Sequence, residues 1–205
     1  MNSFGDMAIQ FIGQVVSMAL VAIFIENFIF TRALGSSTAL VIIRKKNSLI
    51  LFSVILTAIT VAAGLITYFL QPLINSIPNK GYYIPLIYVA VIGFVYIAAL
   101  FVSGMLPPHI LKKIKPMIHI SAFNCVVLGV LLLSSLSEFT LASFLGFGLG
   151  TGIGFSLATF FISIAYDYLH SEAIPKAFRG FPILLIYIGM LSLAFYGMIG
   201  HELPF

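Results

Sequence analysis

The sequence predicts an all-α integral membrane protein, with six transmembrane helices as two inverted three-helix repeats whose first helices, the chain's first and fourth, are interrupted. Three observations predict this fold. Hydrophobic residues make up 61% of the 205 residues and charged residues 8%, whereas an ordinary soluble domain is about 25% charged. The apolar residues form continuous blocks of about 20 residues, long enough to cross the hydrocarbon core as helices. Polar residues enter two of these blocks, in "IENF" and "AFNC".

The blocks define one membrane domain over residues 1–205, with repeat halves of about 7–106 and 117–200. A β-barrel is set aside, because barrel strands alternate apolar and polar residues over about ten positions. The spans are predicted at about 8–31 with a continuation to 43, then 48–70, 84–106, 117–135, 141–166 and 181–200.

The basic residues predict the topology, because Lys and Arg favour cytoplasmic loops. Lys80 lies opposite the main group and Arg32 lies inside the first block. Both termini are therefore predicted on the outer side. Short basic clusters beside apolar spans indicate contact with anionic lipid rather than nucleic acid. The other eight of the ten basic residues follow the first, third and fifth spans: Arg44, Lys45, Lys46, Lys112, Lys113, Lys115, Lys176 and Arg179.

The first block is too long for one straight span. Residues 7–43 would extend about 55 Å as a helix, whereas the hydrocarbon core is about 30 Å thick. The segment Gly35-Ser36-Ser37-Thr38 is the predicted interruption, since glycine breaks a helix and hydroxyl groups can bond the freed backbone groups. Such a break is tolerated only where protein or a wet cavity covers it.

Glu26, Asn27 and Arg32 form a candidate intramembrane polar site, because ionisable residues inside a membrane are functional candidates. Glu26 and Arg32 do not face each other on a continuous helix, so each is expected to find a partner elsewhere. In one interpretation Glu26 caps a neighbouring half-helix and Arg32 reaches the interface. In the other, the three residues line an ion path.

The fourth span repeats this pattern with His119, Ser121, Asn124 and Cys125. Aligning Asn27 with Asn124 divides the chain into halves of three spans, so the second half is inverted relative to the first. Interrupted helices at matching positions of inverted repeats indicate a site at the midplane of the membrane.

Five segments, in this order and spacing, resemble the RnfA and NqrE family. They are "IFIENF" with "ALG" after it, "FNCVVLGV", "LGFGLGTGIGFSLA" and "IPKAFRGFPILLIYIGMLSLAFYGMIG". The family comprises six-span subunits of the Rnf electron transport complex and of the sodium-translocating NADH:quinone reductase. The last motif is the most specific one: Pro175, Phe178, Arg179, Gly180, Met190, Ser192, Leu193, Phe195 and Gly200.

The resemblance implies a subunit of an ion-translocating electron transport complex in a bacterial or archaeal plasma membrane. It implies pairing with a homologous RnfE-like or NqrD-like subunit, or with a second related copy, and contact with flavinylated and NADH-oxidising subunits. It also implies a [2Fe-2S] cluster at the junction of the pair, with two cysteines from each partner, one in each broken helix. No flavin or nicotinamide site is readable in this chain, which is not expected to be catalytic alone.

The sequence departs from this pattern at the expected cluster ligands. Cys125 matches the family's cysteine in the fourth span, with Asn124 beside it, but Ser37 stands where the resemblance implies the other one. Four sulfur ligands are usual for a [2Fe-2S] centre. Three alternatives follow. In the first, a serine alkoxylate, His119 or a partner's cysteine completes the ligand set. In the second the cluster is absent, and in the third an identical or related partner supplies the missing ligands. Cys125 alone also fits a small buried apolar side chain.

Two functions follow from these observations. The first is a redox subunit that relays electrons and couples them to cation transport. The second is a non-redox transporter or a structural membrane partner on the same scaffold. The glycine run at 146–154 is interpreted as close helix packing, because no strand precedes it as a phosphate-binding loop requires.

Overall fold

A computed structural model describes residues 3–43, 48–137, 139–166, 168–170 and 174–199. The basic cluster at 44–46 therefore lies outside the described residues. Within them the chain is helical, in the order α1 (Ser3–Leu20), the π-helix η1 (Val21–Ile25), α2 (Phe28–Arg32), α3 (Ser36–Ile43), α4 (Leu49–Asn75), α5 (Lys80–Ser103), α6 (Pro108–Ala122), α7 (Cys125–Leu136), α8 (Leu141–Tyr166), η3 (Tyr168–His170) and α9 (Phe181–Ile199).

The helices are long and apolar, as the composition predicts. Four of those described are long and apolar enough to cross a membrane, and α6 with α7, bent by 43°, makes a fifth span. The sixth predicted span corresponds to α9, a shorter apolar helix. Large apolar side chains such as Ile50 and Phe101 are more than 70% exposed, as expected for a surface that faces lipid. The chain is a multi-pass membrane protein.

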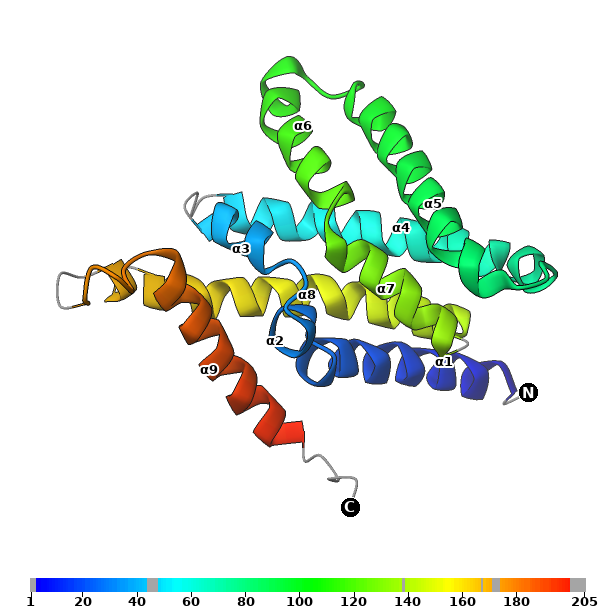
Figure 1. Ribbon diagram of the computed structural model, residues 1–205. Coiled ribbons are helices and arrows are strands. Elements are labelled where there is room, and N and C mark those ends of the chain that lie inside the picture. Colours follow the sequence, from blue (N-terminus) through cyan, green and yellow to red (C-terminus); the bar gives the residue numbers. More distant parts are fainter. Residues whose placement is uncertain (1–2, 44–47, 138, 167, 171–173, 200–205) are drawn as a thin grey trace.

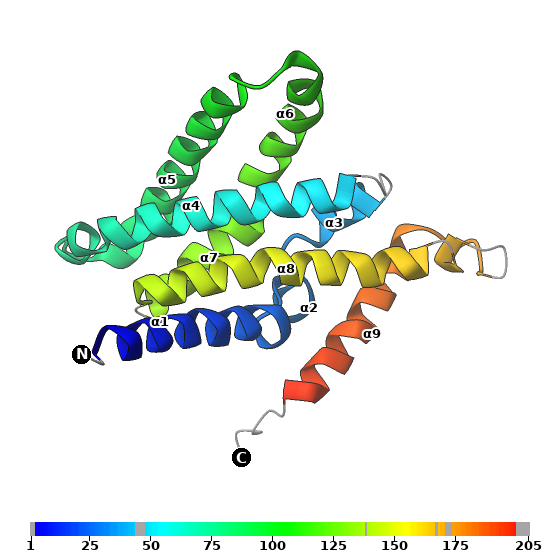
Figure 2. The ribbon, with the colours of Figure 1, turned by 180° about the vertical axis from the view of Figure 1, so that it is seen from behind.

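α8 is the central helix of the fold and lies between α1 and α4 in both views (Figures 1 and 2). Its glycines allow this close packing. A methyl group at Gly146 or Gly150 would overlap the carbonyl oxygens of Val15 and Ala19 in α1, and one at Gly152 would overlap Thr57 of α4. The glycine run thus presents small residues to two neighbouring helices, and its interpretation as close packing is confirmed.

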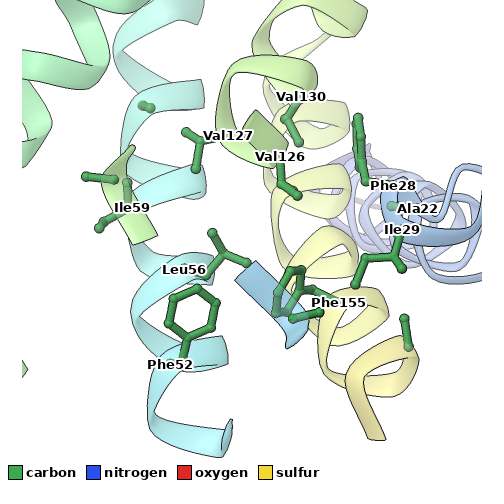
Figure 3. Packing of buried hydrophobic residues seen from close by; sticks show 14 of the residues in the cluster. Ala22, Phe28, Ile29, Phe52, Leu56, Ile59, Val126, Val127, Val130 and Phe155 are labelled. Atoms are coloured by element: carbon green, nitrogen blue, oxygen red, sulfur yellow. The ribbon is translucent and has the colours of Figure 1, made fainter. Parts of the chain in front are cut away.

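The apolar core forms where the short helices meet the middle of α4 and α8. Side chains of α4, α7 and α8 point toward one another there, among them Phe52, Val126 and Phe155 (Figure 3). The ring of Phe30 in α2 stacks on Phe195 of α9 with centroids 4.4 Å apart, which joins α9 to the same core. The core therefore holds the broken segments in place.

The first interruption differs from its prediction. Ser36, Ser37 and Thr38 lie in α3 rather than in a break. The chain breaks first at Glu26 and Asn27 and again over residues 33–35, so the predicted break is confirmed at Gly35 but not at the three residues after it. The second break depends on left-handed backbone at Ala33 and Gly35, with φ of 55° and 78°, a conformation that glycine adopts without steric cost.

Candidate functional site at two helix breaks

Asn27 forms the first break and closes it with four hydrogen bonds. Its Oδ1 accepts from the backbone N–H groups of Ile29 and Phe30, at 3.2 and 3.5 Å, and so caps α2. Its Nδ2 donates to the carbonyl oxygens of Ile23 and Gly154, at 3.0 Å each. Only 1% of Asn27 is exposed. One amide therefore ends the π-helix, begins α2 and ties both to α8.

Asn124 has the equivalent position in the break between α6 and α7. It has extended backbone at the start of α7, and its Oδ1 accepts from the N–H of Val126 at 3.0 Å. The alignment of Asn27 with Asn124 thus pairs two asparagines that each cap a half-helix. The interpretation of the two halves as a repeat remains a prediction.

The break at residues 33–35 meets the break between α6 and α7. The backbone N–H of Gly35 donates to Sγ of Cys125 at 3.0 Å. A methyl group at Gly35 would lie 2.6 Å from Cγ2 of Val126 and 3.3 Å from Oδ1 of Asn124, which explains why this position needs glycine. We call this contact, formed by Gly35, Asn124, Cys125 and Val126, the seam.

The seam also has an open side. Cys125 is exposed, so its interpretation as a small buried apolar side chain is wrong. Asn124 is 3% exposed, yet its Nδ2 has no hydrogen-bond partner within the described part of the chain. A cavity of about 270 Å³ lies beside them and is lined by Asn124, Cys125 and apolar side chains that include Phe123. A buried amide without a partner costs about 1–3 kcal/mol, so this position favours an acceptor from outside the chain.

The resemblance implies that this chain provides two cysteine ligands to a [2Fe-2S] cluster, and the residues present do not fit this. Cys125 is the one cysteine of the sequence, and Ser37 is an exposed residue in the first turn of α3. His119 is engaged elsewhere, because its Nδ1 lies 2.7 Å from the hydroxyl of Tyr96 in α5. At the seam the chain thus presents one thiol, which accepts a backbone hydrogen bond, and one nearby hydroxyl-bearing residue.

Glu26 and Arg32 form an ion pair, contrary to the sequence prediction that each finds a partner elsewhere. Arg32 Nη2 lies 2.8 Å from Oε2 of Glu26, and Nε lies 3.1 Å from the same oxygen. The prediction assumed a continuous helix, but the break at residues 26–27 changes the direction of the chain between the two side chains. This pairing also replaces the expected capping role of Glu26.

Glu26 lines a cavity of about 470 Å³ that sequence reasoning did not find. Polar side chains from three segments share its wall with Glu26. Gln14 of α1 donates to the Ser143 hydroxyl at 3.1 Å, and that hydroxyl lies 3.0 Å from the Thr140 hydroxyl. Gln14 is a polar residue inside an apolar span, and that was the available signal. A carboxylate facing a cavity with hydroxyl and amide oxygens is suited to hold water or a cation.

Comparisons with known proteins identify relatives of this chain. A family model described as "Rnf-Nqr subunit, membrane protein" matches residues 15–201. The A component of a Na⁺-translocating ferredoxin:NAD⁺ oxidoreductase complex of Acetobacterium woodii is 31% identical, over 89% of this chain and 95% of its own. The A components of the ion-translocating oxidoreductase complexes of Syntrophotalea carbinolica and Pasteurella multocida are 28% and 29% identical, over 87% and 93% of this chain and 93% and 97% of their own.

Proposed function

Because the chain belongs to the Rnf-Nqr family of membrane subunits, we propose that it is the A component of an ion-translocating oxidoreductase complex and helps electrons cross the membrane. The observation that carries the proposal is the seam, where two broken helices meet at Gly35 and Cys125 with a 3.0 Å hydrogen bond. Irregular backbone at membrane depth is tolerated only against protein or water, so a structure of this kind marks a functional region.

The partner in this proposal is a homologous RnfE-like or NqrD-like subunit, or a second related copy, which covers the open side of the seam. The exposed Cys125 and the unpartnered amide of Asn124 support this placement. Flavinylated and NADH-oxidising subunits complete the complex. The termini face the outer side of a bacterial or archaeal plasma membrane, in agreement with the excess of basic residues in the opposite loops.

An iron–sulfur cluster between the two subunits would take Cys125 as the one thiolate from this chain, and the partner would supply the others. Such a cluster, when bound, passes single electrons at a potential set partly by hydrogen bonds to its sulfur atoms. This chain's own contribution would be the Gly35 N–H, which donates to Sγ of Cys125 and would thereby influence the potential of a bound cluster.

The ion path in this proposal begins at the cavity beside Glu26. The Glu26 carboxylate lines the cavity and is held from its other side by Arg32. A cation that enters the cavity competes with Arg32 for this carboxylate. The side-chain hydrogen bonds of Asn27 hold the backbone next to Glu26 in place. The alternative function, a non-redox transporter on this scaffold, is favoured by the same cavity together with the absence of a second cysteine in the sequence.

The test uses membranes of the source cell with and without this chain. We expect its deletion to abolish electron transfer from reduced ferredoxin to NAD⁺ and the sodium uptake that accompanies it, and plasmid-borne chain to restore both. Unchanged electron transfer and sodium uptake without the chain would contradict the proposed function.

The Cys125→Ala variant tests the cluster separately. We expect the purified wild-type complex to contain iron and acid-labile sulfide at the junction of the two homologous subunits. The Cys125→Ala complex is expected to lose this iron and sulfide and to lose electron transfer. Ser76→Ala, an exposed change at the far end of α4, is the matched control and is expected to keep both. A Cys125→Ala complex that keeps its iron content, or an iron-free complex that still passes electrons, would remove the cluster and leave the role in the complex standing.

A further inference from the structure

A third cavity lies between α4, α5 and α6. α5 and α6 are joined at one end and diverge toward α4 (Figures 1 and 2). The groove between the three helices encloses about 410 Å³ and is lined by small and branched apolar side chains, such as Ala62 of α4, Ala98 of α5 and Ile118 of α6. This volume is in the range of binding pockets for small molecules.

The described lining of the groove offers no free polar side chain to a ligand. Its one polar residue is Ser103, whose hydroxyl already donates to the Leu100 carbonyl at 2.8 Å. A ligand that needs a hydrogen bond inside the groove, such as a quinone headgroup, would leave its own polar atoms unpaired at a cost of about 1–3 kcal/mol. The interior therefore suits a hydrocarbon chain.

The segment of α6 that contributes Ile114 to one end of the groove is strongly basic. Ile114 and Leu106 line this end, and Lys113 and Lys115 are the immediate neighbours of Ile114, with Lys112 one residue further. All three lysines are exposed, and none forms an ion pair among the described residues. Lysine side chains can run along apolar surface and place their ammonium groups at the level of lipid headgroups.

We propose that this groove is a binding site for one anionic phospholipid, with an acyl chain between α4, α5 and α6 and the phosphate on Lys112, Lys113 and Lys115. Basic pockets between transmembrane helices bind anionic headgroups by this charge complementarity. The occupied groove fills the space between α4 and the α5–α6 hairpin, and so stabilises the hairpin against the rest of the chain.

The experiment uses the full chain purified in detergent with two photoactivatable probes, phosphatidylglycerol and phosphatidylcholine, that carry a diazirine in one acyl chain. We expect phosphatidylglycerol to label peptides of α4 and α5 that line the groove, and phosphatidylcholine to label them much less. Replacing the three lysines with glutamine should weaken phosphatidylglycerol labelling by about fivefold for each lysine removed. Equal labelling by the two lipids, or labelling that the lysine changes leave intact, would overturn the proposal.

The acyl part of the site has its own matched pair of variants. Ala62→Phe fills the groove and is expected to lose groove labelling, whereas Ala90→Phe, on an exposed part of α5 outside the groove, keeps it. The lysine variant changes only exposed side chains, so it remains informative even where Ala62→Phe fails to fold. In the assembled complex the same labelling should persist. Its loss on assembly would show that a partner's helix occupies the groove, which also overturns the proposal.

Discussion

The Asn27→Leu variant is expected to be strongly destabilised. The change removes the cap of α2 and both donated hydrogen bonds, in a position that is 1% exposed. The N–H groups of Ile29 and Phe30 would then be buried without partners. A lost cap costs about 0.5–2 kcal/mol and each unpaired buried group about 1–3 kcal/mol, so the free energy of unfolding should fall by roughly 3 kcal/mol or more.

Thermal unfolding of the purified chain in detergent measures this loss. Asn75→Leu is the matched control, because Asn75 is exposed and accepts a hydrogen bond only from Lys80 at 2.8 Å among the bonds described. Asn27→Asp separates the two roles of the amide, since it keeps the acceptor of the cap and loses both donors. A melting temperature for Asn27→Leu equal to that of Asn75→Leu would show that the break is not held by this side chain.

The Glu26→Gln variant is expected to lose electron-driven cation uptake. The change keeps the shape of the side chain that lines the cavity and removes its charge, so a cation loses its carboxylate ligand. Two opposite unit charges about 4 Å apart attract by about 1–4 kcal/mol between water and a protein surface, so the apparent cation affinity should fall by about tenfold or more. Sodium uptake by vesicles that contain the complex, measured against sodium concentration, checks this value.

Arg32 provides the opposite test of the same idea. Arg32→Gln frees the Glu26 carboxylate from its ion pair at 2.8 Å, so the apparent cation affinity should rise, whereas Glu26→Gln lowers it. Asp6→Asn is the control, because Asp6 is an exposed carboxylate near the start of α1. Equal effects of Glu26→Gln and Asp6→Asn, or changes of the same sign at Glu26 and Arg32, would contradict an ion path through the cavity.

Much of the fold was predictable from the sequence because membrane spans are set by length and hydrophobicity alone. The sequence also aligned Asn27 with Asn124, but it did not predict that each asparagine caps a half-helix. The close contacts of Gly146 and Gly150 with α1 followed from the spacing of small residues.

The details of the site depend on backbone geometry that cannot be predicted from the pattern of apolar residues in the sequence. The sequence assigned the first break to Gly35 and the residues after it, because glycine and hydroxyl residues are the usual helix breakers. The chain breaks earlier, at Glu26 and Asn27, where buried hydrogen bonds to α8 decide the path. The Glu26–Arg32 ion pair and the cavity that Glu26 and Gln14 line both follow from that early break. They could therefore not be predicted from the sequence.

The proposed function rests on the contact between the break at residues 33–35 and Cys125, and a cross-link measures that contact directly. Ser37→Cys adds a second thiol at the start of α3 to a chain whose one cysteine, Cys125, is exposed. A short bifunctional thiol reagent applied to the chain purified in detergent without its partner subunits should join the two cysteines within one chain in Ser37→Cys and not in Ser76→Cys. Failure of Ser37→Cys to cross-link, with both thiols still open to a monofunctional reagent, would show that the broken helices lie apart and would contradict the account.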